Sequence, residues 1–228
     1  MSKKKILIVV SHPDDEVLGC GGSIARFVKD GNQVAVIFTH EGSTSRYDNK
    51  NYKEARLKIK SREAMAIKVS KVLKFKILQF GQNQNLDNRN FDILKNTKNL
   101  IKLFNKFKPN IVFTHHPDDI NEDHKYTFQT VINASRPVTK HIIEKILLME
   151  IPSSTDWNIK SNFKPNFFVS IDKFFDKKLK AFKIYKSENK SFPHSRSLIN
   201  LDAQSKYRGA QVGLAQAEAF EIYRDIQK

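Results

Sequence analysis

The stretch Lys5-Ile6-Leu7-Ile8-Val9-Val10-Ser11-His12-Pro13-Asp14-Asp15-Glu16 decides the fold class of this chain. Its first half, Ile6–Val10, is a continuous apolar run, which is typical of a strand buried on both faces of a parallel sheet. Its second half is polar and acidic and follows that strand directly. In open α/β folds the ligand crevice lies beyond the carboxyl ends of the strands. We therefore expect Ser11–Glu16 to face such a crevice.

Outward from this stretch, short β-rich runs alternate with longer helical patterns. The predicted strands are Lys5–Val10, Gln33–His40, Phe75–Phe80, Asn110–His115, Lys145–Ile151 and Phe167–Ile171. The predicted helices are Val17–Lys29, Tyr52–Val72, Phe91–Phe107, Asp123–Ser135, Asp172–Ser187 and most of Leu198–Ile226. This alternation predicts right-handed βαβ units, hence a mostly parallel, Rossmann-like layered sheet flanked by helices, with a C-terminal helical extension. Because no linker or repeat interrupts the pattern, we expect a single domain over residues 1–228.

Composition narrows the class of protein. The chain has 228 residues, of which 39% are hydrophobic, enough to bury a core without disulfides. The single cysteine, Cys20, excludes a disulfide framework within the chain and a Cys-rich zinc module, and it favours a reducing compartment. No apolar run reaches the length of a signal sequence or a membrane span. We therefore expect a cytoplasmic protein.

The charge is strongly basic, with 40 Lys and Arg against 24 Asp and Glu, a net charge of +16. Such a surplus favours nucleic acid or other anionic partners. The basic residues are spread from Lys3 to Lys228, however, which is typical of a generally solvated surface. A basic nucleic-acid-binding protein or metal-dependent nuclease is therefore the alternative hypothesis, and a metal-binding protein without turnover is a third.

The motif after the first strand has the residue types of a metal site. Pro13 stiffens the turn and can hold His12 and Asp15 convergent, so that an imidazole nitrogen and a carboxylate oxygen meet at one cation. Asp14, Asp15 and Glu16 would repel one another in a crevice, and a bound cation relieves that repulsion.

A second motif follows the fourth predicted strand, from Thr114 to His124, and is again rich in His and Asp. Its last residue, His124, begins the next helix and can project back into the crevice as a third ligand. Three protein ligands with an open position are typical of a catalytic zinc site. Ferrous iron can occupy the same ligands.

At these residues the chain resembles a known family. His12-Pro13-Asp14-Asp15-Glu16, together with Asn121-Glu122-Asp123-His124, is similar to the motifs of the PIG-L/LmbE-like deacetylases, which are zinc-dependent and remove acetyl groups from N-acetylglucosamine-type sugars. The resemblance implies that His12, Asp15 and His124 bind metal and that Asp14 is the general base. It also implies that Arg62 contacts substrate.

The chain departs from the family pattern at Asn121, where many relatives have a His that helps to stabilise the oxyanion. Asn121 can still donate one amide hydrogen bond but carries no positive charge. His115, His116 and His194 are alternatives for that role. His194 and Arg196 also suit recognition of sugar hydroxyls or of a phosphate.

The hypothesis is therefore a metal-dependent amidohydrolase, with Zn²⁺ or Fe²⁺ as cofactor. Its partner is an N-acetylated amino sugar in glycoconjugate or nucleotide-sugar form, and its products are acetate and a free amine.

Overall fold

The computed structural model describes residues 3–41, 52–81, 92–138 and 140–227. The strands are β1 (Lys5–Val10), β2 (Gln33–Phe38), β3 (Lys76–Gln79), β4 (Ile111–His115), β5 (Lys145–Met149), β6 (Phe167–Ser170) and β7 (Ala217–Asp225). The helices are α1 (Asp15–Lys29), α2 (Tyr52–Leu73), α3 (Ile93–Phe107), α4 (Glu122–Ala134), α5 (Phe175–Phe182) and α6 (Leu198–Ala210). Within the described residues, none of these helices combines the length and the apolar character that crossing a bilayer requires.

The strands form one sheet in the order β3-β2-β1-β4-β5-β7-β6. Strands β1 to β5 pair in parallel, and β7 pairs antiparallel with both β5 and β6. From β1 the chain builds the sheet toward β2 and β3, and it then returns to the other side of β1 with β4 and β5. The switch point lies between β1 and β4, where open α/β sheets bind their ligands. The predicted mostly parallel, layered sheet is confirmed.

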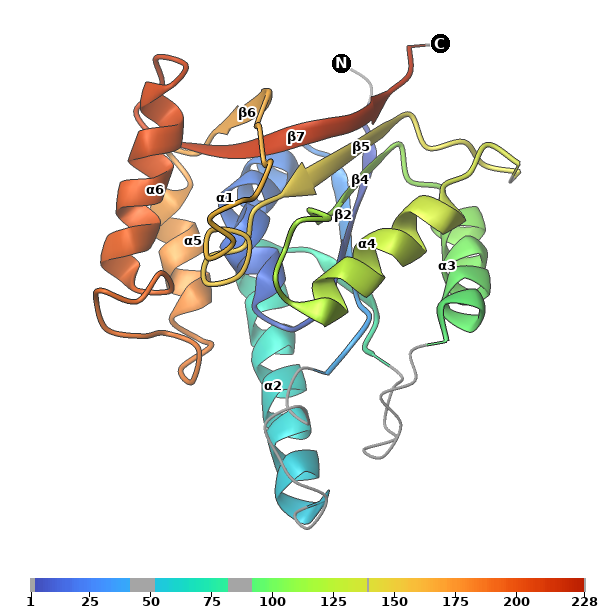
Figure 1. The fold of residues 1–228 in the computed structure, drawn as a ribbon, viewed down its shortest axis with the longest axis horizontal. Helices are drawn as coiled ribbons and strands as arrows, with labels where there is room; N and C mark the ends of the chain where they lie inside the picture. The colour runs from blue at the N-terminus through green and yellow to red at the C-terminus, as the bar shows by residue number, and fades with distance from the viewer. Residues whose placement is uncertain (1–2, 42–51, 82–91, 139, 228) are drawn as a thin grey trace.

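Helices cover both faces of the sheet, as Figure 1 shows, with α1, α2, α5 and α6 on one side and α3 and α4 on the other. Alternation along β1 builds both layers, because successive side chains of a strand point to opposite faces. Ile6, Ile8 and Val10 belong to the core under α1, α2 and α5, whereas Leu7 and Val9 pack with α3 and α4. All five are buried, which explains the continuous apolar run.

Most predicted elements are confirmed with small changes at their ends, and the predicted helix start at Phe91 lies outside the described residues. The predicted helix Asp172–Ser187 is helical only over Phe175–Phe182. The helical extension is helical only over Leu198–Ala210, and the expectation of helix beyond Gly213 is wrong, because Ala217–Asp225 is strand β7. Ala and Glu are good helix formers, and they dominate the start of this segment. Pairing with β5 and β6 on both edges overrides that local preference.

Strand β7 also supports helix α1. The helix is interrupted at Cys20, whose backbone leaves the helical region at φ −151° and ψ 25°. Just beyond, the backbone N–H groups of Gly22 and Ser23 donate to the carboxylate of Glu218 at 3.0 and 2.7 Å. Lys178 on α5 donates to the same carboxylate at 2.6 Å. The buried Glu218 therefore ties α1 and α5 to the last strand.

Candidate metal centre

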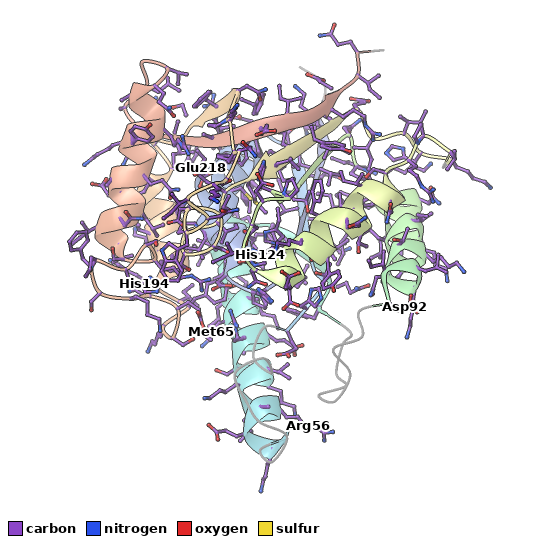
Figure 2. All side chains as sticks on the ribbon, in the orientation of Figure 1. Arg56, Met65, Asp92, His124, His194 and Glu218 are labelled. Atoms are coloured by element: carbon purple, nitrogen blue, oxygen red, sulfur yellow. The ribbon has the colours of Figure 1, made fainter. Side chains whose placement is uncertain are left out.

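The two predicted motifs meet at the switch point of the sheet. The first motif leaves the carboxyl end of β1 and enters α1, and the second leaves the neighbouring strand β4 and enters α4. Figure 2 shows His124 at the start of α4, near the centre of the molecule. His12, Asp15 and His124 are all buried there.

The three predicted ligands form a nearly regular triangle. His12 Nδ1 lies 3.5 Å from Asp15 Oδ2, His124 Nε2 lies 3.3 Å from the same oxygen, and the two ring nitrogens are 3.3 Å apart. Ligand atoms about 2.0–2.1 Å from a tetrahedral zinc ion are separated by about 3.3–3.4 Å. The other oxygen of Asp15, Oδ1, is buried without a hydrogen-bond partner among the described residues. The donor set therefore fits a single zinc-sized cation.

The charge of the site also calls for a cation. Burial lowers the pKa of His124, but the negative charges of Asp15 and Asp119 and the hydrogen bonds to them outweigh it and raise the pKa to about 10. Without a metal, a proton on His124 balances these carboxylates. A divalent cation bound by the neutral imidazole would supply two positive charges to these carboxylates, where the proton supplies one.

Each histidine of the triangle has a carboxylate against its other ring nitrogen. His12 Nε2 lies 2.8 Å from Asp123 Oδ2, and His124 Nδ1 lies 2.9 Å from Asp119 Oδ2. Such partners fix the orientation of a ligating imidazole and increase its basicity. Both aspartates lie within the second motif, but their spacing alone did not reveal this role.

Asp14 lies beside the triangle in a constrained conformation. Its backbone has a φ of 130°, a region that non-glycine residues seldom occupy. Its N–H donates to Glu16 Oε2 at 2.9 Å, and Arg62 Nη2 donates to the preceding carbonyl of Pro13 at 2.9 Å. These contacts hold the strained turn at the end of the first motif.

The carboxylate of Asp14 is bound by both predicted arginines. Arg62 Nη2 donates to Oδ1 at 3.1 Å, and Arg196 Nη1 donates to Oδ2 at 3.0 Å. Glu188, which sequence reasoning missed, accepts from Arg196 Nη1 at 2.9 Å and lies 3.9 Å from Arg62 Nη2. Two guanidiniums thus face two buried carboxylates. Burial raises the pKa of Asp14, and the two arginines offset part of that rise.

Glu16, the last acid of the first motif, has a structural role. Tyr185 donates its hydroxyl to Glu16 Oε1 at 2.6 Å, and the Asp14 N–H donates to the other oxygen. Complete burial raises the pKa of Glu16 to about 8. The residue therefore holds the backbone of Asp14, and its burial favours the protonated form.

Asn121 caps helix α4. Its Oδ1 accepts from the backbone N–H of Asp123 at 2.9 Å, so its amide NH₂ is the group that can donate to a substrate. Asn121 N in turn donates to Asp119 Oδ1 at 2.9 Å.

The three histidines that were alternatives for stabilising the oxyanion, His115, His116 and His194, lie in different surroundings. His115 Nε2 accepts from the backbone N–H of Ser11 at 2.8 Å, and its ring stacks on His124 with centroids 3.9 Å apart. Burial lowers the pKa of His115 to about 3, so it is a neutral packing partner. His116 is buried and lies 3.5 Å from Glu221.

His194 instead lies toward α5 and α6, apart from the labelled His124 (Figure 2). Its Nδ1 accepts from Arg196 N at 3.0 Å, and its ring lies 5.3 Å from that of the exposed Trp157. His40, which sequence reasoning missed, follows β2 with its Nε2 at 3.8 Å from Asp123 Oδ1, and burial lowers its pKa to about 4.

The chain is similar in sequence to a family of de-N-acetylases and to a bacterial deacetylase. The sequence profile of the family described as PIG-L, GlcNAc-PI de-N-acetylase, matches residues 7–135. An uncharacterized deacetylase of Escherichia coli K12 is 30% identical over 191 residues, which cover 81% of this chain and 92% of that protein.

Two solved structures share the fold. An N,N'-diacetylchitobiose deacetylase from Pyrococcus horikoshii is 22% identical, with a TM-score of 0.75 over 96% of this chain and 83% of its own. A 4-carboxy-2-hydroxymuconate hydratase from Pseudomonas putida is 18% identical, with a TM-score of 0.78 over 99% of this chain and 98% of its own. Proteins with this fold therefore differ in reaction, and the fold alone does not define the reaction of this chain.

Proposed function

Because this chain belongs to the PIG-L, GlcNAc-PI de-N-acetylase family, we propose that it hydrolyses the acetamido group of an N-acetylated amino sugar, releasing acetate and a free amine. The observation that carries the proposal is the triangle of His12, Asp15 and His124 with the carboxylate of Asp14 beside it. We propose zinc as the cation, and ferrous iron fits the same donor set.

The chemistry requires a stronger nucleophile and a stronger electrophile than water and an amide provide. His12, Asp15 and His124 would hold a divalent metal, which when bound would supply a water of pKa about 7 and a polarised acetyl carbonyl. Asp14 takes a proton from the attacking water on a carboxylate oxygen and later delivers it to the departing amine. Arg62 and Arg196 hold that carboxylate in one orientation during both transfers.

The remaining predicted site residues contact the substrate. The amide NH₂ of Asn121 donates to the oxyanion that develops on the acetyl carbonyl. Arg196 Nη2 makes no hydrogen bond within the described residues, and it donates to a sugar hydroxyl. His194, on the loop that also carries Arg196, contacts the sugar at the rim. The substrate is a glycoconjugate or a nucleotide sugar, and a cytoplasmic reaction stays a prediction from the single cysteine.

Elemental analysis of the purified protein, paired with an acetate-release assay on a panel of N-acetylated sugars, tests the proposal. We expect about one equivalent of zinc or iron per chain, with acetate release that a chelator abolishes and added metal restores. Metal without acetate release from any N-acetylated sugar would contradict the deacetylase function. No metal after loading would remove the site itself. Neither the site nor the relatives described above support the alternative of a nucleic-acid-binding protein or nuclease.

A further inference from the structure

Three consecutive hydroxyl residues, Ser153, Ser154 and Thr155, follow strand β5 and contact two different parts of the site. Ser154 Oγ donates to Asp119 Oδ1, and Thr155 Oγ1 donates to Asp119 Oδ2 at 2.9 Å. Thr155 Oγ1 also accepts from the backbone N–H of Ile151 at 3.0 Å. Because a hydroxyl has a single proton, that bond directs the proton of Thr155 toward Asp119.

These bonds complete the hydrogen bonding of the Asp119 carboxylate. Oδ1 accepts from Asn121 N and Ser154, and Oδ2 accepts from Thr155 and lies 2.9 Å from His124 Nδ1. A carboxylate has about four acceptor positions, so all of them are in use. Asp119 therefore cannot rotate without breaking its hydrogen bonds from Asn121, Ser154 and Thr155, and the ring of His124 is fixed with it.

Ser153 contacts the part of the site that holds Asp14, through Arg196. Its Oγ accepts from Arg196 Nε at 2.6 Å, and Arg196 Nη1 donates to Asp14. The backbone of Ser153 has a φ of 67°, in the left-handed region. This turn separates a side chain that contacts Arg196 from two side chains that contact Asp119.

We propose that Ser153–Thr155 is the positioning segment of the active site. Ser154 and Thr155 orient the metal ligand His124 through Asp119, and Ser153 orients Asp14 through Arg196. The inference rests on the proposed function, but its two parts have readouts that do not need turnover.

The first readout is metal affinity, measured by competition with a chromophoric chelator. Ser154→Ala and Thr155→Val are expected to weaken zinc binding by about tenfold, the lower end of the effect of losing the partner of a ligating histidine, because Asp119 stays but loses one of the hydrogen bonds that fix it. Thr155→Ser keeps the hydroxyl and should restore wild-type affinity. Thr97→Val is the matched control, because Thr97 is a buried threonine on α3 whose hydroxyl has no partner among the described residues. Zinc affinities within twofold of wild type in both Ser154→Ala and Thr155→Val would overturn this part.

The second readout concerns Ser153. Ser153→Gly tolerates the left-handed backbone, and it should keep zinc affinity while accelerating water exchange at the Arg196 Nε–H NMR signal, which Arg196→Lys assigns by its loss. Acetate release by Ser153→Gly should show a lower kcat.

Equal loss of zinc affinity in Ser153→Gly and Thr155→Val would instead indicate a loop that is only structural, and it would overturn the division of roles. Unchanged exchange at Arg196 would overturn the role of Ser153. If the wild type releases no acetate, the proposed function fails while the zinc and NMR comparisons still decide the inference.

Discussion

Arg196 Nη1 donates to Asp14 Oδ2 at 3.0 Å, although 182 positions separate the two residues in the chain. The same nitrogen donates to Glu188 at 2.9 Å, and Arg62 binds the other oxygen of Asp14. The proposed general base is therefore held by two arginines from distant segments of the chain. Its carboxylate is oriented and charge-balanced before any substrate arrives.

Asp14→Asn separates metal binding from proton transfer. Asparagine keeps the size of the side chain but cannot take a proton from water, so the acetate-release rate should fall by about 10²–10⁴-fold. Metal content, measured by elemental analysis, should be unchanged. Asp176→Asn, at an exposed position on α5, is the control and should retain wild-type rates. Near-normal turnover in Asp14→Asn would exclude Asp14 as the base.

His12→Ala and His124→Ala should each lose the metal, because either change removes one corner of the triangle. Elemental analysis after zinc loading and desalting measures the effect. His141→Ala removes an imidazole that contacts the carbonyl of Pro109 and has no place in the triangle, and it should bind metal as the wild type does. Full metal content in both triangle variants would mean that the ion binds elsewhere.

Arg196→Ala should reduce kcat/KM by about tenfold or more, the scale of a lost hydrogen bond to a charged group. The guanidinium charge is already balanced by Asp14 and Glu188, so the factor should be the same for a plain and a phosphorylated N-acetylated sugar. Steady-state kinetics on the two sugars decides this. A selective rise in KM for the phosphorylated sugar would assign Arg196 to phosphate recognition.

Glu188→Gln should make the enzyme sensitive to anions. Removal of this buried carboxylate leaves Arg62 and Arg196 with one negative partner, so inorganic phosphate should inhibit the variant at lower concentration than the wild type. Inhibition constants for phosphate, with chloride at matched ionic strength as the control, measure the change. Equal constants in the two proteins would mean that Glu188 does not balance this charge.

Glu16→Gln should flatten the pH dependence of stability in the metal-free protein. The folded-state pKa of Glu16 is raised to about 8 by burial, so the folded chain keeps a proton that the unfolded chain releases above its ordinary pKa. Wild-type stability should therefore fall as pH rises between about 5 and 8, by up to about 1.4 kcal/mol per pH unit relative to Glu16→Gln.

Urea unfolding at pH 5, 6, 7 and 8 provides that comparison. Glu54→Gln, at an exposed position on α2, should follow the wild-type curve. Parallel curves for wild type and Glu16→Gln would contradict the raised pKa.

The convergence of His12, Asp15 and His124 could be predicted from the sequence because each motif directly follows a strand, and parallel strands end at the same edge of a sheet. Glu188 could not be predicted, because it lies beyond the predicted helix Asp172–Ser187 and reaches the site only through tertiary packing. Tyr185 lies within that predicted helix, but helical spacing does not indicate that its hydroxyl meets Glu16. Strand β7 was missed for a related reason. Its alanines and glutamates favour a helix locally, and only the neighbouring strands make it extended.

The late position of β7 in the chain has a consequence for biosynthesis. It lies between β5 and β6, and Glu218 accepts the amide protons beyond the interruption in α1. On the ribosome, His12, Asp15 and His124 all emerge long before that strand does. A product that stops short of Glu218 keeps every proposed metal ligand, yet it has an open strand edge and buried amides without acceptors, which are the features that lead to aggregation and degradation. We therefore expect quality control of this protein to depend on the completion of its last strand, and the proposed metal-binding residues alone would not protect a truncated chain.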